Sequence, residues 1–288
     1  MHIAYLASQV TMPGSPIRRA DAFEHDLIMS LLRPAFEARG ARLTDIAWDD
    51  PGADWASFDG ALIGTAWDYW DRMEEFLAAL AAIEAKTPLF NRAALVRWNI
   101  HKSYLRDIEA KGARLIPTVW MNRADEASVQ AAFDTLGTDD LVLKRQVGAG
   151  ADGQVRLRRG EPVPALAHPM MAQGFLPSIE REGEFSFIFI DGALSHALIK
   201  RPAAGDYRIQ SLYGGTEAAV TPPEEDRKAA QSVLNMLGTP PLYARVDMVR
   251  GEDGGLLLME LELIEPYLYP EQGPQLGDRL ADAVLGRL

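Results

Sequence analysis

The stretch YARVDMVRGEDGGLLLMELELIE, residues 243–265, decides how this chain folds and where its chemistry lies. Its two halves alternate apolar and polar residues, and they flank Asp253-Gly254, a dipeptide typical of tight β-hairpin turns. We therefore expect an antiparallel hairpin. Because successive side chains of a strand point to opposite faces, the hairpin has one charged and one apolar face. The expected apolar face consists of Val246, Met248, Met259, Leu261 and Leu263.

The charged face gathers an arginine and three carboxylates. With a two-residue turn at that dipeptide, Arg245 faces Glu262 and Asp247 faces Glu260. If the turn lies one residue later, Asp247 faces Glu262 instead, and the carboxylates still cluster. Residues that face each other across a hairpin have Cβ atoms about 5 Å apart. Two carboxylates that close repel each other unless one is protonated or a cation lies between them, and Mg²⁺ is the usual cation beside phosphates. The pattern favours a metal site; the alternative is a solvated strand face with Arg–Glu pairs.

A second informative segment is Gly148-Ala-Gly150-Ala-Asp-Gly153, which fits the spacing GxGxxG. A dinucleotide-binding fingerprint needs a strand before this motif and a helix after it. Here residues 154–158 alternate like a strand, so the context contradicts that fingerprint. The alternatives are a loop whose backbone N–H groups cover nucleotide phosphates, or a surface hairpin with glycine turns. Lys144 ends the preceding apolar strand, from which a lysine can reach phosphates.

The first 95 residues have the pattern of an open α/β domain. The expected elements are strands at 3–7, 43–48 and 61–65, a helix over 18–39 that Pro34 kinks or splits, and a helix after the capping-box pattern Asp71-Arg-Met-Glu74.

Beyond residue 95, short strands dominate. Asn99 is expected to cap a helix that ends at Lys111, and Asp191-Gly192 is expected to form a second hairpin turn. The irregular segment 201–217 has the composition of a mobile active-site loop. Further strands are expected at 115–120, 141–144, 154–158, 185–190 and 193–200, and helices at 124–136 and 223–237.

Composition narrows the function classes. The chain has 288 residues, 48% of them hydrophobic, and a formal net charge of −12. We expect a globular protein of about two domains that binds neither nucleic acid nor an anionic membrane. The absence of cysteine excludes disulfides and thiolate chemistry, and the five histidines lack zinc-site spacing. No signal peptide or membrane span is recognisable, so a cytoplasmic protein is expected.

The order of these segments resembles the ATP-grasp superfamily of carboxylate–amine ligases, from about residue 60 to residue 270. The matching motifs are Asn99-Ile-His-Lys102 with Ile116-Pro-Thr118, the strand of Lys144 with its glycine-rich loop, Met171-Ala-Gln173-Gly-Phe175, Gly183-Glu184-Phe-Ser186, and the two strands of the acidic hairpin. Trp67-Asp68-Tyr69 and Leu258–Pro266 are similar to the glutathione synthetase and RimK-like branch. Within that branch, the chain resembles cyclo-ligases of cycloserine biosynthesis, which close O-ureido-serine into a ring.

The resemblance implies an α/β (α+β) chain with the ATP-grasp fold. The expected parts are an N-terminal open α/β domain (1–95), a small central lid subdomain with the glycine-rich loop (96–170), and a C-terminal antiparallel-sheet domain with the metal site (171–288). The chain departs from the family pattern at three positions. Glu262 stands where Asn is common, Arg145 where Pro is common, and Gln173 where Glu is common.

The resemblance also implies a reaction and a set of site residues. A small amino-acid-like carboxylate would be phosphorylated by ATP, and an amine would displace phosphate from the acyl phosphate to form an amide. The implied nucleotide ligands are Lys102, Lys144, Gly148, Gly150, Gly153, Gln173, Phe175, Glu180 and Glu184. Two Mg²⁺ ions, with Mn²⁺ as a substitute, would be held by Asp247, Glu260 and Glu262. Arg245, Lys200 and Arg208 would stabilise the phosphoryl group or the carboxylate, and Trp67, Asp68 and Tyr69 would line the substrate site.

Two other functions stay open at this level. One is a nucleotide-binding regulatory or scaffold protein without ligase activity, and the other is an ATP-dependent kinase of a small molecule. The expected partners are a small-molecule carboxylate and an amine. A homodimer is the default oligomeric state.

Overall fold

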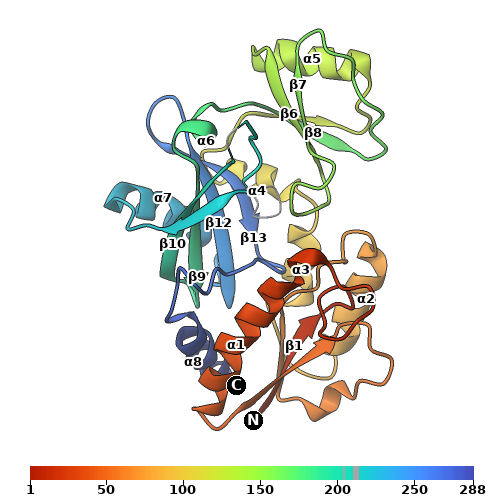
Figure 1. The fold of residues 1–288 in the computed structure, drawn as a ribbon, viewed down its shortest axis with the longest axis vertical. Helices are drawn as coiled ribbons and strands as arrows, with labels where there is room; N and C mark the ends of the chain where they lie inside the picture. The colour runs from red at the N-terminus through yellow and green to blue at the C-terminus, as the bar shows by residue number, and fades with distance from the viewer. Residues whose placement is uncertain (204, 210–213) are drawn as a thin grey trace.

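The structure is a computed structural model that describes residues 1–203, 205–209 and 214–288. Its strands form three sheets arranged along the long axis of the molecule (Figure 1). Within these residues, no helix combines the length and the apolar character that crossing a membrane requires.

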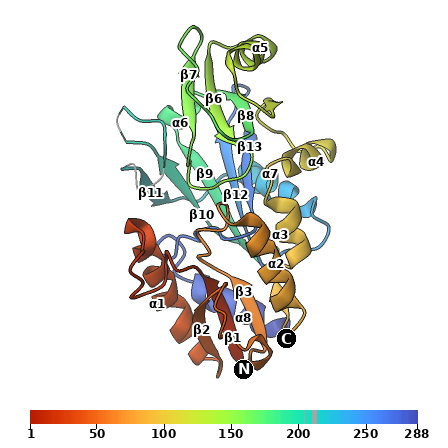
Figure 2. The same cartoon turned by 90° about the vertical axis from the view of Figure 1, so that its right-hand side faces the viewer.

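The first sheet is parallel, in the order β2-β1-β3-β4, which confirms the expected open α/β arrangement. Parallel neighbours need crossover connections, and helices on the faces of the sheet supply them (Figure 2). The elements are β1 (His2–Ala7), the 3₁₀ turn η1 (Ala20–Ala22), α1 (Phe23–Glu37), β2 (Arg42–Ala47), the 3₁₀ turn η2 (Trp55–Ser57), β3 (Gly60–Ile63), α2 (Met73–Glu84) and β4 (Leu89–Phe90).

Two expectations about these helices were wrong in detail. Pro34 does not split α1, because it lies in the last turn and its carbonyl still accepts from the N–H of Ala38 (2.9 Å). The capping box at Asp71 does not form. Arg72 occupies the N-cap of α2 without a side-chain cap, and its guanidinium pairs with Glu75 (2.5 Å) instead.

The second sheet is antiparallel, in the order β5-β8-β6-β7, and is backed by α5. It has an apolar core of its own, which includes Val129, Phe133, Leu141, Leu143 and Leu157. The glycine-rich loop joins β6 to β7, so the strand–loop–strand prediction is confirmed. The elements are β5 (Thr118–Met121), α5 (Glu126–Leu136), β6 (Asp140–Arg145), β7 (Val155–Arg158) and β8 (Met170–Gly174).

The third sheet is antiparallel, in the order β11-β10-β9-β12-β13. The turn at Asp191-Gly192 is confirmed: Ile190 pairs with Ala193, and both turn residues have positive φ, 51° and 79°. The elements are α6 (Ser178–Arg181), β9 (Glu184–Ile190), β10 (Ala193–Arg201), β11 (Thr216–Ala219), α7 (Glu224–Asn235), β12 (Tyr243–Arg250) and β13 (Leu256–Glu262).

The β12–β13 hairpin confirms the pairs Arg245–Glu262 and Asp247–Glu260, although its turn differs from the prediction. The strands end at Arg250 and Leu256, so the connection is a five-residue loop. A β-bulge offsets the longer loop and keeps the predicted pairs in register. Met248 pairs with Leu258, so Met259 is the extra residue on β13. Met259 therefore lines a cavity, whereas its expected place was the core.

Two helices connect the first sheet to the others, α3 (Ala93–Asn99) and α4 (Tyr104–Ala110). Asn99 ends α3 and caps no helix, contrary to the expectation. Its side chain instead donates to the carbonyl of Leu261 (2.9 Å) and accepts from the N–H of Leu263 (3.1 Å), which ties α3 to β13.

The last helix, α8 (Leu276–Gly286), returns to the first sheet and packs on α1. Its residues Leu276, Leu280 and Val284 share one apolar core with residues of both the first and the third sheets. Arg39 of the first sheet's region pairs with Asp278 (2.9 Å) and Asp282 (2.5 Å) of this helix. The domain boundaries near residues 95 and 170 stay a prediction.

The segment 201–217 is irregular only in part, since β11 begins at Thr216. Residues 204 and 210–213 of the expected loop lie outside the described residues.

Candidate active site

One cavity of about 230 Å³ is lined by residues of the second and third sheets and by residues 19–24, 67 and 70, which lie outside the strands of the first sheet. It brings together most of the residues singled out in the sequence, although these come from distant parts of the chain. The singled-out residues that line it are Trp67, Lys102, Lys144, Gly148, Gly150, Gln173, Phe175, Glu184, Lys200, Arg245, Asp247, Glu260 and Glu262.

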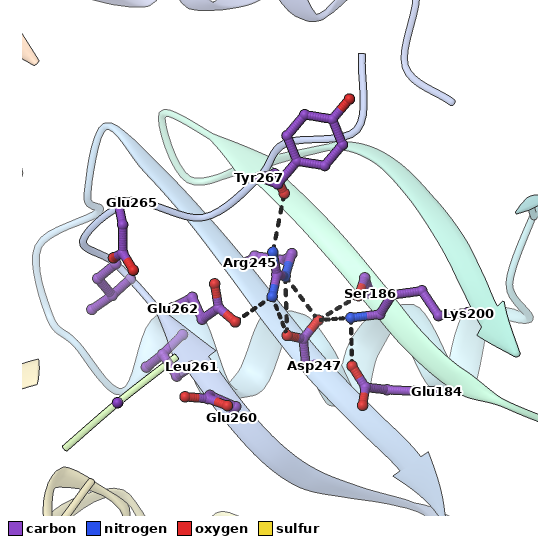
Figure 3. A network of polar contacts seen from close by, with 12 residues as sticks. Glu184, Ser186, Lys200, Arg245, Asp247, Glu260, Leu261, Glu262, Glu265 and Tyr267 are labelled. Carbon is purple, nitrogen blue, oxygen red and sulfur yellow. Dashed lines mark hydrogen bonds and ion pairs between the residues drawn. The ribbon is translucent and has the colours of Figure 1, made fainter. Parts of the chain in front are cut away.

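A buried charge network lies on the floor of this cavity (Figure 3). The Nε of Arg245 donates to Asp247 Oδ2 (3.0 Å), and its Nη2 contacts Glu262. On the neighbouring strands, Lys200 Nζ lies 2.5 Å from a Glu184 oxygen and 3.4 Å from Asp247 Oδ1. Asp247 and Lys200 are only 2% and 3% exposed, so these charges interact with little solvent screening.

The carboxyl groups of the network differ in their protonation. Burial alone would raise the pKa of Asp247, but Arg245 and Lys200 outweigh it and hold that pKa at about 2. Burial raises the pKa of Glu262 to about 7, and the Asp247 and Glu260 carboxylates contribute to this shift in spite of Arg245. Burial and the nearby Glu262 raise the pKa of Glu265 to about 8. The cavity floor thus has more carboxylates than cations to balance them.

The donor chemistry of Asp247, Glu260 and Glu262 suits a hard divalent cation. Within the described residues, however, no group of three acidic or histidine side chains converges as a ready-made metal site. Protein cations explain this, since Arg245 contacts both Asp247 and Glu262. Lys102 contacts Glu260.

Two side chains on the second sheet present unsatisfied polar groups. Burial lowers the pKa of the Lys144 ammonium, which lines the cavity and has no hydrogen-bond or ion-pair partner among the described residues. Gln173 donates from its amide nitrogen to Thr118 Oγ1 (2.9 Å), but its buried amide oxygen has no partner there. A partly buried cation and a buried acceptor that lack partners among the described residues are costly, so a ligand that pairs with both gains affinity.

Lys102 connects the glycine-rich loop to the hairpin. Its backbone N–H donates to the carbonyl of Gln146 (2.8 Å), and its Nζ donates to the carbonyl of Gly148 (3.0 Å). The same ammonium contacts Glu260. Without the resemblance, the residues alone favour a helix-surface lysine at this position. Lys102 lies inside the site because the chain between α3 and α4 runs beside the loop, where its N–H donates to Gln146.

Five singled-out residues do not line the main cavity. Glu180 pairs with Arg156 (2.8 Å), and Arg208 pairs with Asp206 (2.7 Å). Asp68 accepts from the indole N–H of Trp48 (2.8 Å) and points away from the cavity. The other two are Tyr69, which is buried and lines a small adjoining pocket beside Glu260, and Gly153, which lies against Arg145.

The sequence reasoning missed Tyr269. Its ring lies 5.8 Å from Lys200 Nζ and 5.6 Å from the guanidinium carbon of Arg245, and it lines the cavity. Its φ of 49° is unusual for a non-glycine residue and indicates local strain. The available signal was its place between Pro266 and Pro270, shortly after the acidic strand.

Comparison with known proteins gives relatives over nearly the whole chain. The family described as "D-cycloserine synthetase DcsG, N-terminal domain" matches residues 3–91. The cycloserine biosynthesis protein DcsG of Streptomyces lavendulae is 30% identical over 267 residues, which are 84% of this chain and 87% of that protein. A glutathione synthetase of Prochlorococcus marinus strain MIT 9313 is 28% identical over 266 residues, covering 88% of this chain and 77% of that protein.

Solved structures agree with this similarity. The crystal structure of D-cycloserine synthetase DcsG matches with a TM-score of 0.85 and 26% identity, over 100% of this chain and 99% of that one. An ATP-grasp RimK domain protein of Sphaerobacter thermophilus has the same fold, with a TM-score of 0.69 and 19% identity over 99% of this chain and 100% of that one.

Proposed function

The chain belongs to the ATP-grasp superfamily of carboxylate–amine ligases, and from this premise we propose how its own residues divide the work. It is an ATP-dependent enzyme that joins a carboxylate to an amine. The assignment of roles rests on one observation: Lys144, Arg245 and the acidic hairpin line the same cavity.

We propose that the second sheet and its loop hold the nucleotide. The unpaired ammonium of Lys144 suits a phosphate, and the unpaired acceptor of Gln173 suits an amino group on the base. Phe175 offers a flat apolar wall, and the loop at Gly148 and Gly150 covers the phosphates through its backbone. We assign a lesser role to Glu180, because Arg156 occupies its carboxylate outside the cavity.

We propose that the acidic hairpin holds the metal. Asp247, Glu260 and Glu262 supply oxygen ligands, and two Mg²⁺ ions would balance the excess carboxylate charge, with Mn²⁺ as a substitute. ATP and Mg²⁺, when bound, supply the phosphoryl group and neutralise its charge. The protein cations that now occupy these carboxylates have to shift to admit metal ions.

We propose that Arg245 and Lys200 stabilise the reacting groups. A carboxylate oxygen of the substrate forms a bond to the γ-phosphorus as the bond to ADP breaks, which gives an acyl phosphate. The amine then forms a bond to the acyl carbon as phosphate leaves and the amine loses a proton. Both steps develop negative charge on oxygen, which fixed cations in a dry cavity stabilise. Arg208, paired with Asp206 beside the cavity-lining Tyr207, is a weaker candidate.

We propose a small amino-acid-like substrate. Trp67 and Trp70 line the cavity beside Arg19, Asp21 and Glu24, a mixture of charges suited to a zwitterion. The similarity to a protein named D-cycloserine synthetase supports an amine and a carboxylate in one molecule. The expected homodimer remains part of this proposal.

A thermal-shift titration tests the nucleotide and metal roles. ATP is compared with GTP and NAD⁺, each with and without Mg²⁺, and a ligand at 100 times its Kd adds about 2.7 kcal/mol to stability. A rise in Tm specific to ATP with Mg²⁺ supports the assignment and justifies a screen of amino-acid carboxylates for ADP release. No rise under any condition contradicts it. A stable phosphorylated product without an amide would point to a kinase.

A further inference from the structure

Arg145 occupies an unexpected place beneath the glycine-rich loop. It follows Lys144 on β6, so its side chain leaves the strand on the opposite face. It nevertheless borders the cavity, because the loop folds back over it. Its Nη1 donates to Asp152 Oδ2 in the loop (2.5 Å), and its side chain is only 11% exposed.

Two of the three loop glycines pack against this arginine. A Cβ at Gly153 would lie 3.1 Å from Arg145 Cδ, which is tighter than an ordinary contact. A Cβ at Gly148 would lie 3.5 Å from Arg145 Cβ, whereas one at Gly150 would meet nothing within 4 Å. All three glycines have positive φ, so the loop needs them for its path as well. The loop is therefore shaped around the arginine side chain.

The Nε of Arg145 indicates that neighbouring residues hold this side chain in its buried position. This N–H is buried and has no hydrogen-bond partner among the described residues. A surface arginine would rotate such a group into water. Here the ion pair with Asp152 and the contacts with Gly148 and Gly153 keep the side chain in place.

We propose that Arg145 is a positioning residue that sets the glycine-rich loop over the nucleotide phosphates by holding Asp152. The loop then has two cationic anchors: Lys102 at the carbonyl of Gly148, and Arg145 at Asp152. The proposal rests on the proposed phosphate role of this loop. It gives Gly148 and Gly153 a second task, which is to accommodate the arginine.

The test measures binding, so it does not depend on finding the amine or carboxylate substrate. The variants Arg145→Gln, Asp152→Asn and the double variant are compared with the native chain by calorimetry, with Mg²⁺ and a non-hydrolysable ATP analogue. Adenosine, which has no phosphates, is the control ligand. Each single variant is expected to bind the analogue about tenfold more weakly, equal to about 1.4 kcal/mol, with adenosine binding unchanged.

The double variant tests whether the two residues act as a pair. It is expected to bind no more weakly than either single variant, because partners in one interaction are not additive. Arg145→Lys keeps a charge and is expected to retain part of the affinity. The matched control is Arg159→Gln, which follows β7 and breaks ion pairs with Asp139 (2.6 Å) and Asp134 (2.7 Å) outside the cavity; it is expected to leave binding unchanged.

Limited proteolysis gives a second readout, with faster cleavage within residues 146–154 expected for the single variants. Unchanged analogue binding in Arg145→Gln would overturn the proposal. Additive losses in the double variant would also overturn it, since Asp152 would then act through another group such as Arg19. If the native chain binds no analogue at all, the proposed phosphate role fails instead, which is a distinguishable result.

Discussion

Lys102 makes an ion pair with Glu260, and the same ammonium donates to the carbonyl of Gly148. One side chain thus joins the loop expected over the phosphates to the strand expected to bind metal. On our proposal, Glu260 would give up this ammonium to hold Mg²⁺, and the Lys102 charge would then be available to a phosphate. The pair explains why the carboxylates can lie close together without metal.

Replacing Lys144 with alanine should weaken nucleotide binding. Its ammonium lines the cavity and has no partner in the part of the chain that the structure describes, so a charged hydrogen bond to phosphate worth about 1.5–3 kcal/mol would be lost. We expect the Kd of ADP with Mg²⁺, measured by calorimetry, to rise about 10- to 100-fold. Lys86→Ala on the exposed surface is the control. Equal ADP affinity in both variants would contradict a phosphate contact.

Glu260→Gln should abolish turnover and leave the fold intact. The change removes one negative charge of the expected metal site without changing the side-chain volume. We expect ADP release to fall to background while the circular dichroism spectrum stays native. Glu252→Gln in the connecting loop of the same hairpin is exposed and should keep full activity. Full activity in Glu260→Gln would contradict the assignment of Glu260 as a metal ligand.

Arg245→Met should destabilise the metal-free protein. The guanidinium is buried against Asp247 and Glu262, and removing one partner of a buried ion pair typically costs about 3–5 kcal/mol. Urea unfolding should report this loss, and added Mg²⁺ should recover part of it by replacing the missing charge. Arg114→Met breaks a pair with Asp253 in which the two side chains are 53% and 63% exposed, and it should cost less. A larger loss in Arg114→Met would contradict the argument.

Asp45→Asn should remove a pH-dependent part of the stability. Hydrogen bonds from His25 and then Arg33 outweigh burial and lower the pKa of Asp45 to about 2, from an ordinary value of 3.8. A lowered folded-state pKa stabilises the protein above the unfolded pKa, and this contribution disappears as the pH falls from about 4 to about 2. After a discount for partial solvation, we expect a deficit of about 2 kcal/mol at pH 7.

The pH dependence of the difference between the native protein and Asp45→Asn shows whether ionisation of Asp45 is its cause. Urea midpoints of native protein and Asp45→Asn should converge below pH 4 and coincide near pH 2. Asp71→Asn, at an exposed position, should follow the native curve throughout. Parallel curves for Asp45→Asn and the native chain, without convergence at low pH, would show that ionisation of Asp45 is not the cause.

The acidic hairpin was predictable because side-chain alternation and a turn signal act over short distances. Arg245–Glu262 and Asp247–Glu260 pair as expected, even though the turn is longer than the two residues assumed. The bulge at Met259 cancels the shift. Alternation alone cannot reveal a bulge, because a bulge is a property of how two strands pair and not of the pattern within one strand.

Other features depend on contacts between distant segments. Asn99 has the chemistry of a helix cap, but the unpaired backbone of β13 uses its amide instead. The sequence alone cannot distinguish Asp68 from a cavity-lining residue, because its hydrogen bond from the indole of Trp48 depends on the fold. Tyr269 gave no periodic signal, because it lies on irregular chain after the last strand.

The packing of α8 against α1 has a consequence for protein synthesis. The first sheet is translated first, and domains usually begin to fold as they leave the ribosome. Its apolar core, however, is completed by Leu276, Leu280 and Val284, which are translated more than two hundred residues after β3. The earliest part of the nascent chain therefore keeps an exposed apolar face until residues 276–286 emerge.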